Sequence, residues 1–211
     1  MLDIIKKHRF IAILRNVPLE KAEKTVKALY DGGIRIFEVT FNPSKSDTIE
    51  TVTKTFDLIK KLGDDVSLCA GTVVCEDFVR AAKEAGAGCI VSPHSDEKII
   101  KLTKELGMIS IPGAFTPTEI MNAYNWGADI VKIFPILPDN IAYLKNVISP
   151  LSHIPFITTG GVRLDTAKDF LDCGAVAVAA GATVITPDCL ANDDYEGIKK
   201  NAEAFVNICR V

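Results

Sequence analysis

Short apolar runs recur along the chain, and several of them follow a segment that ends in glycine. Examples are YDGGIRIFEV, EAGAGCIVSP, NWGADIVKIFP and DCGAVAVAAG. A glycine that ends a helix, followed at once by a continuous apolar strand, is typical of a βα unit whose parallel sheet is buried on both faces. The pattern therefore predicts an α/β fold built from repeated units.

Eight such runs can be distinguished: FIAIL, IRIFEV, VSLCA, CIVS, MISIP, DIVKIF, PFITT and AVAVAA. Their ends recur about every 20 to 30 residues, close to the length of a βαβ repeat. Amphipathic segments such as PLEKAEKTVKALYDGG and SDEKIIKLTKELG lie between them. Eight similar units without a Gly-x-Gly-x-x-Gly fingerprint favour a closed (β/α)8 TIM barrel over an open doubly wound sheet.

The two ends of the chain extend this picture. LDIIKKH predicts a short N-terminal helix that closes the bottom of the barrel, and DDYEGIKKNAEAFVNIC predicts a final helix with an apolar stripe. No linker or low-complexity tract divides the sequence. The 211 residues are therefore expected to form a single domain, 1–211, near the lower end of what such a barrel requires, about 200 to 250 residues.

Composition narrows the possible partners. With 24 basic and 27 acidic residues the net charge is −3, which gives no electrostatic footprint for nucleic acid or an anionic membrane. No apolar run reaches the ~20 residues of a membrane span or resembles a signal peptide, so a cytoplasmic location is expected. The six cysteines form no C-x-x-C pair and are interpreted as reduced, buried thiols.

Candidate chemistry is expected at the carboxyl ends of the strands, where barrel enzymes build their sites. The three histidines do not assemble a metal site there, and His94 is interpreted as a loop residue. The residues at the predicted strand ends are Arg15, Glu38, Thr40, Thr72, Pro93, Gly113, Lys132, Gly160, Gly161 and Gly181.

Lys132 is the most informative of these residues, because it sits in the apolar run DIVKIFP. Successive strand side chains point to opposite faces, so Lys132 points away from Val131 and Ile133, into the lumen or toward the helices. Burial disfavours the ammonium form and leaves a neutral amine, a nucleophile toward carbonyl groups. For a lone strand lysine, extension to the rim or pairing with a carboxylate is about twice as frequent as a catalytic role. The residues that accompany Lys132 therefore decide between these interpretations.

Two charged side chains accompany it. Glu38 ends IRIFEVT and can shuttle protons in Schiff-base chemistry, or act only as a buried ion-pair partner. Arg15 closes FIAILRN and can bind a carboxylate through paired hydrogen bonds, or be only a surface arginine. A lysine, a carboxylate and an arginine at one end of a barrel favour covalent chemistry on an anionic carbonyl compound.

Glycines follow the last two predicted strands. Gly160 and Gly161 come after the seventh strand, and Gly181 after the eighth. Barrels often bind phosphate at these loops, where backbone N–H groups can approach the anion. A glycine pair can also simply form a tight turn, but its place after the seventh strand favours phosphate binding.

Taken in order, these motifs resemble the bacterial KDPG/KHG aldolases, which cleave 2-keto-3-deoxy-6-phosphogluconate or 4-hydroxy-2-oxoglutarate. The resemblance runs over essentially the whole chain, through GGIRIFEVTF, AGTV, IVSPH, IPGAFTPTE, VKIFP and TTGGV. It implies a class I aldolase in which Lys132 forms the Schiff base and Glu38 is the general acid/base, working with a bound water. It implies no cofactor, and it implies a homotrimer.

The resemblance also assigns the substrate-binding residues. Those around the pyruvoyl part would be Thr72 and Pro93, with Thr40 and Phe134 nearby. Those around the phosphate would be Gly160, Gly161, and the turn formed by Gly181 and Ala182.

Two positions depart from the pattern of the family. Many members carry arginine four residues after the catalytic glutamate, where this chain has Asn42. Another branch has arginine at the end of the first strand, where Arg15 stands, so Arg15 is assigned to the substrate carboxylate. Many members have serine at the position of Ala182; alanine removes one hydrogen bond to a charged group, worth about 1.5 to 3 kcal/mol. Weaker phosphate binding is therefore expected.

The expected function is cleavage of 2-keto-3-deoxy-6-phosphogluconate to pyruvate and glyceraldehyde 3-phosphate, of 4-hydroxy-2-oxoglutarate to pyruvate and glyoxylate, or of both. A related pyruvate-dependent aldolase acting on 2-keto-3-deoxy-6-phosphogalactonate, or on an unphosphorylated 2-keto-3-deoxy acid, is the alternative. A non-catalytic barrel that binds a sugar phosphate or keto acid as a sensor ranks below both.

Overall fold

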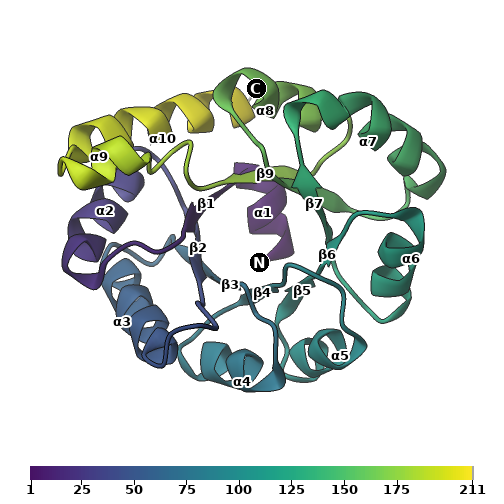
Figure 1. Cartoon of the computed structure of the whole chain (residues 1–211), viewed down its shortest axis with the longest axis horizontal. Helices are drawn as coiled ribbons and strands as arrows, with labels where there is room; N and C mark the ends of the chain where they lie inside the picture. Colours follow the sequence, from purple (N-terminus) through teal and green to yellow (C-terminus); the bar gives the residue numbers. More distant parts are fainter. Residues whose placement is uncertain (211) are drawn as a thin grey trace.

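A computed structural model describes residues 1–210 and forms one closed ring of strands surrounded by helices (Figure 1). The predicted (β/α)8 barrel is confirmed; Val211, the last residue of the predicted domain, lies outside the described residues. The strands are β1 (Phe10–Leu14), β2 (Ile36–Thr40), β3 (Ser67–Gly71), β4 (Cys89–Val91), β5 (Ile109–Ile111), β6 (Gly113–Ala114), β7 (Val131–Ile136), β8 (Phe156–Gly160) and β9 (Ala177–Ala180).

Helices alternate with these strands and cover the outside of the ring (Figure 1). Two short 3-10 turns, Pro138–Asn140 and Ser149–Leu151, flank α7. The helices are α1 (Leu2–His8), α2 (Leu19–Asp31), α3 (Thr48–Lys60), α4 (Glu76–Glu84), α5 (Glu97–Glu105), α6 (Pro117–Asn125), α7 (Ile141–Ile148), α8 (Leu164–Asp172), α9 (Pro187–Ala191) and α10 (Tyr195–Cys209).

The ring closes at a proline. All strand pairs are parallel, in the order β5-β4-β3-β2-β1-β9-β8-β7-β6, so the two end strands are separated in sequence only by Pro112. The predicted strand MISIP, 108–112, corresponds to β5 and ends at Pro112, which has no N–H to donate, and the short β6 that follows was not predicted. The carbonyls on this seam still bond across it: the Asp129 N–H donates to Ser110 O (3.0 Å) and the Lys132 N–H to Pro112 O (2.8 Å).

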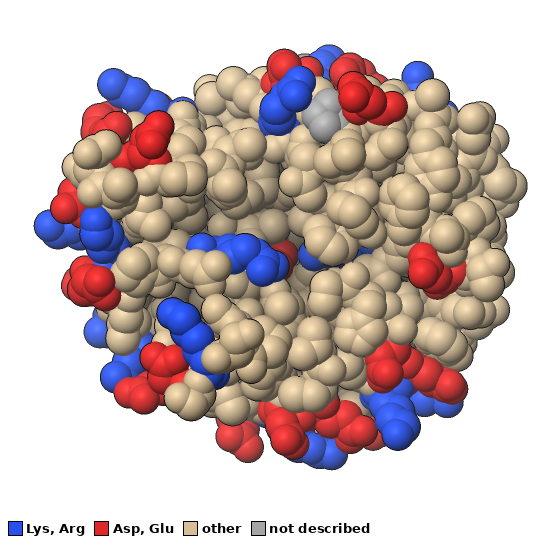
Figure 2. Space-filling view, in the orientation of Figure 1, with Lys and Arg blue, Asp and Glu red and all other residues tan. Residues whose placement is uncertain are grey.

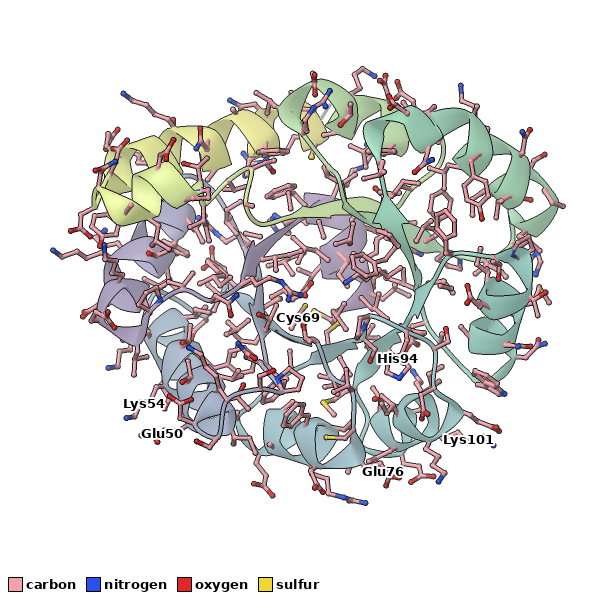
Figure 3. The ribbon with its side chains drawn as sticks, viewed as in Figure 1. Glu50, Lys54, Cys69, Glu76, His94 and Lys101 are labelled. Carbon is pink, nitrogen blue, oxygen red and sulfur yellow. The ribbon has the colours of Figure 1, made fainter. Side chains whose placement is uncertain are left out.

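Strand alternation separates two apolar layers. Side chains such as Phe37 and Val131 point outward and pack under the helices. Side chains such as Cys69, Cys89 and Ile157 fill the lumen instead. Figure 3 places Cys69 inside the ring of strands, while the labelled charged residues of α3 and α5 lie on its outer rim. The barrel interior is therefore a packed apolar core rather than a pore.

Both predicted terminal helices are present. Helix α1 lies across one end of the ring in Figure 1, and its Ile5 is fully buried among the lumen residues. Helix α10 packs against α2 and α8. The predicted apolar stripe on α10 is buried throughout: Ile198, Ala202, Phe205, Val206 and Cys209.

The cysteines only partly match the prediction. All six are free, but Cys69, Cys89 and Cys209 are buried whereas Cys75, Cys173 and Cys189 are partly exposed. Within residues 1–210, no helix is long and apolar enough to cross a membrane. The cytoplasmic location stays a prediction of the sequence.

The burial of Ile5 gives a test of how α1 closes the barrel. Ile5→Ala removes a fully buried side chain from the lumen, so we expect the free energy of unfolding to fall by about 2 to 5 kcal/mol. Its neighbour Ile4 is 36% exposed, and Ile4→Ala is expected to stay within about 0.5 kcal/mol of the wild type. Urea unfolding of both variants measures this difference, and equal losses would contradict the assigned role of α1.

Candidate active site

A cavity of about 520 Å³ opens at the carboxyl ends of the strands. Near the middle of the face shown in Figure 2, basic and acidic side chains meet in a hollow. Charged, apolar and glycine residues contribute different parts of its wall. The lining residues are Ile13, Arg15, Asn16, Glu38, Lys132, Phe134, Thr159, Gly160, Val162, Ala179, Ala180, Gly181, Ala182, Thr183, Ile185, Pro187 and Leu190.

Lys132 reaches this cavity from β7, between Gly113 of β6 and Ile157 of β8 in the sheet register. Its side chain faces the lumen and is buried, with only 4% of the residue exposed. Nζ lies 4.5 Å from the centroid of the Phe134 ring. Burial lowers the pKa of Lys132; the negative charge of Glu38 opposes that shift and the positive charge of Arg15 adds to it.

Glu38 faces the same cavity from β2. It is 1% exposed, and its Oε2 has no hydrogen-bond partner among the described residues. The carboxyl group lies over Gly71 of β3, where any Cβ would overlap it. Burial raises the pKa of Glu38, against the lowering effect of the charges on Lys132 and Arg15. The Lys132 amine therefore loses its proton at a lower pH than a free lysine, and the Glu38 carboxyl keeps its proton to a higher pH than a free glutamate.

Arg15 extends from the end of β1 and is exposed. One of its guanidinium nitrogens, Nη2, donates to Thr72 Oγ1 (3.0 Å). Thr72 follows β3 and has a φ of 57°, a left-handed conformation that costs free energy for a β-branched residue. This backbone turn places the Thr72 hydroxyl beside the guanidinium.

Four predicted site residues lie outside the cavity wall: Thr40, Thr72, Pro93 and Gly161. The Thr40 hydroxyl donates to Leu14 O (3.3 Å), and Thr40 lines a neighbouring cavity of about 420 Å³. Thr72 reaches the site only through Arg15. The backbone of Pro93 packs closely against Gly113, where a Cβ would collide with it. Phe134 does line the cavity, beside Lys132.

The part of the cavity wall that contains Gly160, Gly181 and Ala182 is mostly apolar. Gly160 has a φ of 125°, a conformation that favours glycine, and a Cβ there would lie only 3.2 to 3.3 Å from backbone atoms of Pro135 and Ile136. The Gly161 N–H, expected to face phosphate, donates to Ile136 O (2.6 Å). Gly181 and Ala182 lie in the wall as expected. Val162, Ile185, Pro187 and Leu190 complete this end.

The sequence did not single out several lining residues. Thr159 has a buried hydroxyl with no hydrogen-bond partner among the described residues, and it lines the cavity. Strand alternation could have found it, because Thr159 is two residues after the lumen residue Ile157. Asn16 lies in a loop and α9 is a short helix. Sequence periodicity does not predict that either one lies against the cavity.

His94 lies beside the strands rather than in the cavity wall (Figure 3). Its carbonyl accepts a hydrogen bond from the Gly113 N–H (3.3 Å). Among residues 1–210 there is no group of three or more His, Cys, Asp or Glu side chains placed to hold a metal ion.

The (β/α)8 barrel, with a buried lysine and a buried glutamate facing one cavity at its mouth, suits a carbon–carbon lyase of the aldolase class. The chain belongs to the KDPG and KHG aldolase family, because the model of that family matches residues 1–201.

Relatives and solved structures agree with this assignment. The chain is 30% identical over 189 residues to a KHG/KDPG aldolase of Escherichia coli (strain K12), covering 89% of this chain and 86% of the relative. It is 31% identical over 187 residues to a probable 2-dehydro-3-deoxy-6-phosphogalactonate aldolase of Rhizobium meliloti (strain 1021), covering 87% and 84%. A solved structure described as "Native KDPGal structure" is 28% identical with a TM-score of 0.83, covering 95% and 94%.

The opposite pKa shifts predict a stability cost at the site. In the unfolded chain the pKa of Lys132 is about 10.5, and in the folded chain it is lower. Between these two pKa values the unfolded chain binds more protons, so the free energy of unfolding rises with pH. The folded chain keeps the Glu38 proton above 4.5, so in that lower window stability falls as pH rises.

Replacing both groups by neutral side chains removes both pH-dependent contributions. We expect Glu38→Gln/Lys132→Met to be more stable than the wild type near pH 7 by about 1 to 4 kcal/mol, with smaller slopes in both windows. Urea unfolding between pH 5 and 10 measures this. A double variant that is less stable than the wild type would mean that the two groups stabilise the fold.

Proposed function

We propose that the protein cleaves a 2-keto-4-hydroxy acid to pyruvate and an aldehyde through a Schiff base on Lys132. The observation that carries this proposal is the burial of the Lys132 amine, with lowered pKa, in the same cavity as the buried Glu38 carboxyl. A neutral amine attacks a ketone carbon, and a carboxyl whose pKa is raised by burial can serve as both acid and base.

The first half of the reaction forms the imine. The Lys132 amine attacks C2 of the keto acid and forms a carbinolamine. Glu38, directly or through a water, supplies a proton to the departing hydroxyl, and loss of water leaves a protonated imine. The unpartnered Glu38 Oε2 is the atom available for this transfer.

The second half breaks the carbon–carbon bond. Glu38 takes the proton of the C4 hydroxyl, the C3–C4 electron pair moves into the imine, and the aldehyde leaves. The remaining enamine is protonated at C3, and water hydrolyses the resulting imine to pyruvate and free Lys132. The imine is the electron sink, and the cycle requires no cofactor.

Substrate orientation is assigned to the charged end of the cavity. Arg15 binds the carboxylate of the keto acid, and its bond to Thr72 holds the guanidinium over the mouth. Phe134 lies against the pyruvoyl part, while Pro93 and Thr40 lie outside the cavity wall and only support it from behind. A carboxylate fixed in this way aligns C2 with the Lys132 amine.

The tail of the substrate is assigned to the part of the same cavity that is lined by Gly160, Gly181 and Ala182. For a 6-phosphorylated substrate, backbone N–H groups of the turn at Gly181 and Ala182 would face the phosphate. Gly161 contributes through the shape of its turn, because its N–H is bonded to Ile136 O. The preferred substrates are 2-keto-3-deoxy-6-phosphogluconate and 4-hydroxy-2-oxoglutarate.

A second candidate is favoured by the apolar character of the tail end. Ala182 offers no hydroxyl, the Gly161 N–H is already used, and the Thr183 hydroxyl donates to Val162 O (3.0 Å). These features suit an unphosphorylated 2-keto-3-deoxy acid. The C4 epimer, 2-keto-3-deoxy-6-phosphogalactonate, stays an alternative in view of the relative in Rhizobium meliloti. The homotrimer remains an expectation that rests on the family resemblance.

Borohydride trapping tests the proposed chemistry. With pyruvate present, reduction is expected to add a stable pyruvate-derived group to the peptide that contains Lys132, because borohydride reduces the imine. Lys132→Arg keeps the positive charge but has no competent amine, so it should give no adduct and no turnover. Intact mass and peptide mapping read out the result. An adduct on another lysine, or none, contradicts the proposal.

Ala182→Ser tests where the tail binds. A hydroxyl at this position adds one hydrogen bond to a charged group, so kcat/KM for the 6-phosphorylated substrate should rise roughly tenfold. The value for an unphosphorylated 2-keto-3-deoxy acid should change little. Ala191→Ser, at the exposed end of α9, is the control. Pyruvate release measures the rates, and an unchanged ratio between the two substrates places the tail elsewhere.

A further inference from the structure

Arg15 stands on a turn that is tied to the next loop of the barrel. The residue after it, Asn16, has a φ of 54°, a left-handed conformation that asparagine adopts more readily than most residues. This turn directs the chain out of β1 toward α2. Asn16 Oδ1 accepts a hydrogen bond from Asn42 Nδ2 (3.2 Å), which comes from the loop between β2 and α3.

The Asn42 side chain is itself held in one orientation. Its Oδ1 accepts from the Ser44 N–H (3.1 Å), so its Nδ2 is the atom that faces Asn16. Its backbone N–H donates to Thr48 Oγ1 (2.6 Å), on the buried first residue of α3. The adjacent Phe41 N–H donates to Gly71 O (2.8 Å) at the end of β3. Asn42 is therefore anchored to α3 before it reaches across to Asn16.

These bonds place Arg15 between two fixed points. On one side the Asn16 turn is tied through Asn42 to α3, and on the other side the guanidinium donates to Thr72. An exposed arginine side chain otherwise samples many rotamers, and ordering it opposes ligand binding. The link from Asn42 is neutral, so it restrains the turn without placing a carboxylate beside the guanidinium.

We propose that Asn42 is a positioning residue that, through Asn16, holds Arg15 in the geometry required to bind the substrate carboxylate. The proposal rests on the proposed function, because Arg15 has this task only there. Asn42 lies outside the wall of the cavity that holds Lys132 and Glu38 and lines the neighbouring cavity. Its loss should therefore weaken binding of the keto acid and leave the chemistry on Lys132 intact.

Two variants separate this effect from a general loss of folding. Asn42→Ala removes both side-chain bonds. Asn42→Asp keeps an acceptor for the Ser44 N–H but turns an oxygen toward Asn16 Oδ1, and it adds a negative charge near Arg15. We expect KM for 4-hydroxy-2-oxoglutarate to rise on the order of tenfold in Asn42→Ala, and further in Asn42→Asp, with kcat within about twofold of the wild type. Asn207→Asp, on the exposed face of α10, should change neither constant.

A double-mutant cycle with Arg15→Ala decides the mechanism. In the Arg15→Ala background, Asn42→Ala should raise KM by less than about twofold, because the group that it positions is gone. Equal effects of Asn42→Ala in both backgrounds overturn the proposal and assign Asn42 a structural role only. An unchanged KM in Asn42→Ala beside a raised KM in Arg15→Ala also overturns it, while the role of Arg15 stands. An unchanged KM in Arg15→Ala itself contradicts the carboxylate assignment, and the positioning proposal falls with it.

Discussion

The burial of two ionisable groups at the mouth of an apolar lumen is the constraint on which the site depends. Water does not stabilise the ammonium form of Lys132 or the carboxylate form of Glu38 there, so the pKa of the amine falls and that of the carboxyl rises. Each charge partly offsets the shift of the other. The absence of a Cβ at Gly71 makes room for the carboxyl group. The desolvation that shifts both pKa values also opposes folding.

The closure of the barrel and the position of the Lys132 amine depend on the same backbone hydrogen bonds. The strand seam at Pro112 bonds to the backbone of Lys132, and Gly113 pairs with Lys132 in the sheet. Pro93 packs closely on Gly113 from the neighbouring loop. The seam thus fixes the height of Lys132 in the barrel. The cavity has a charged part at Arg15 and an apolar wall to which α9 contributes. This difference can orient an elongated anionic substrate.

Much of the fold could be predicted because periodicity and glycine placement are local properties. The strand runs, the terminal helices and the placement of Lys132 on the strand face opposite Val131 and Ile133 follow from periodicity along one segment. That this face is the lumen is decided by the structure. The short strand β6 after Pro112 was missed, because a proline at the end of an apolar run does not reveal where a ring closes. Thr40 and Gly161 were expected to face the substrate, yet the Thr40 hydroxyl bonds to Leu14 and the Gly161 N–H bonds to Ile136.

The sequence by itself determined the barrel class, the end of the strands where the charged residues gather, and the candidates Lys132, Glu38 and Arg15. Those properties depend on spacing along the chain. Only the tertiary structure decided that Glu38 Oε2 has no hydrogen-bond partner among residues 1–210, that the Gly161 N–H is already used, and that Asn42 reaches Asn16. Each of these depends on atoms from different loops meeting within hydrogen-bond distance, and packing of the whole ring sets those distances.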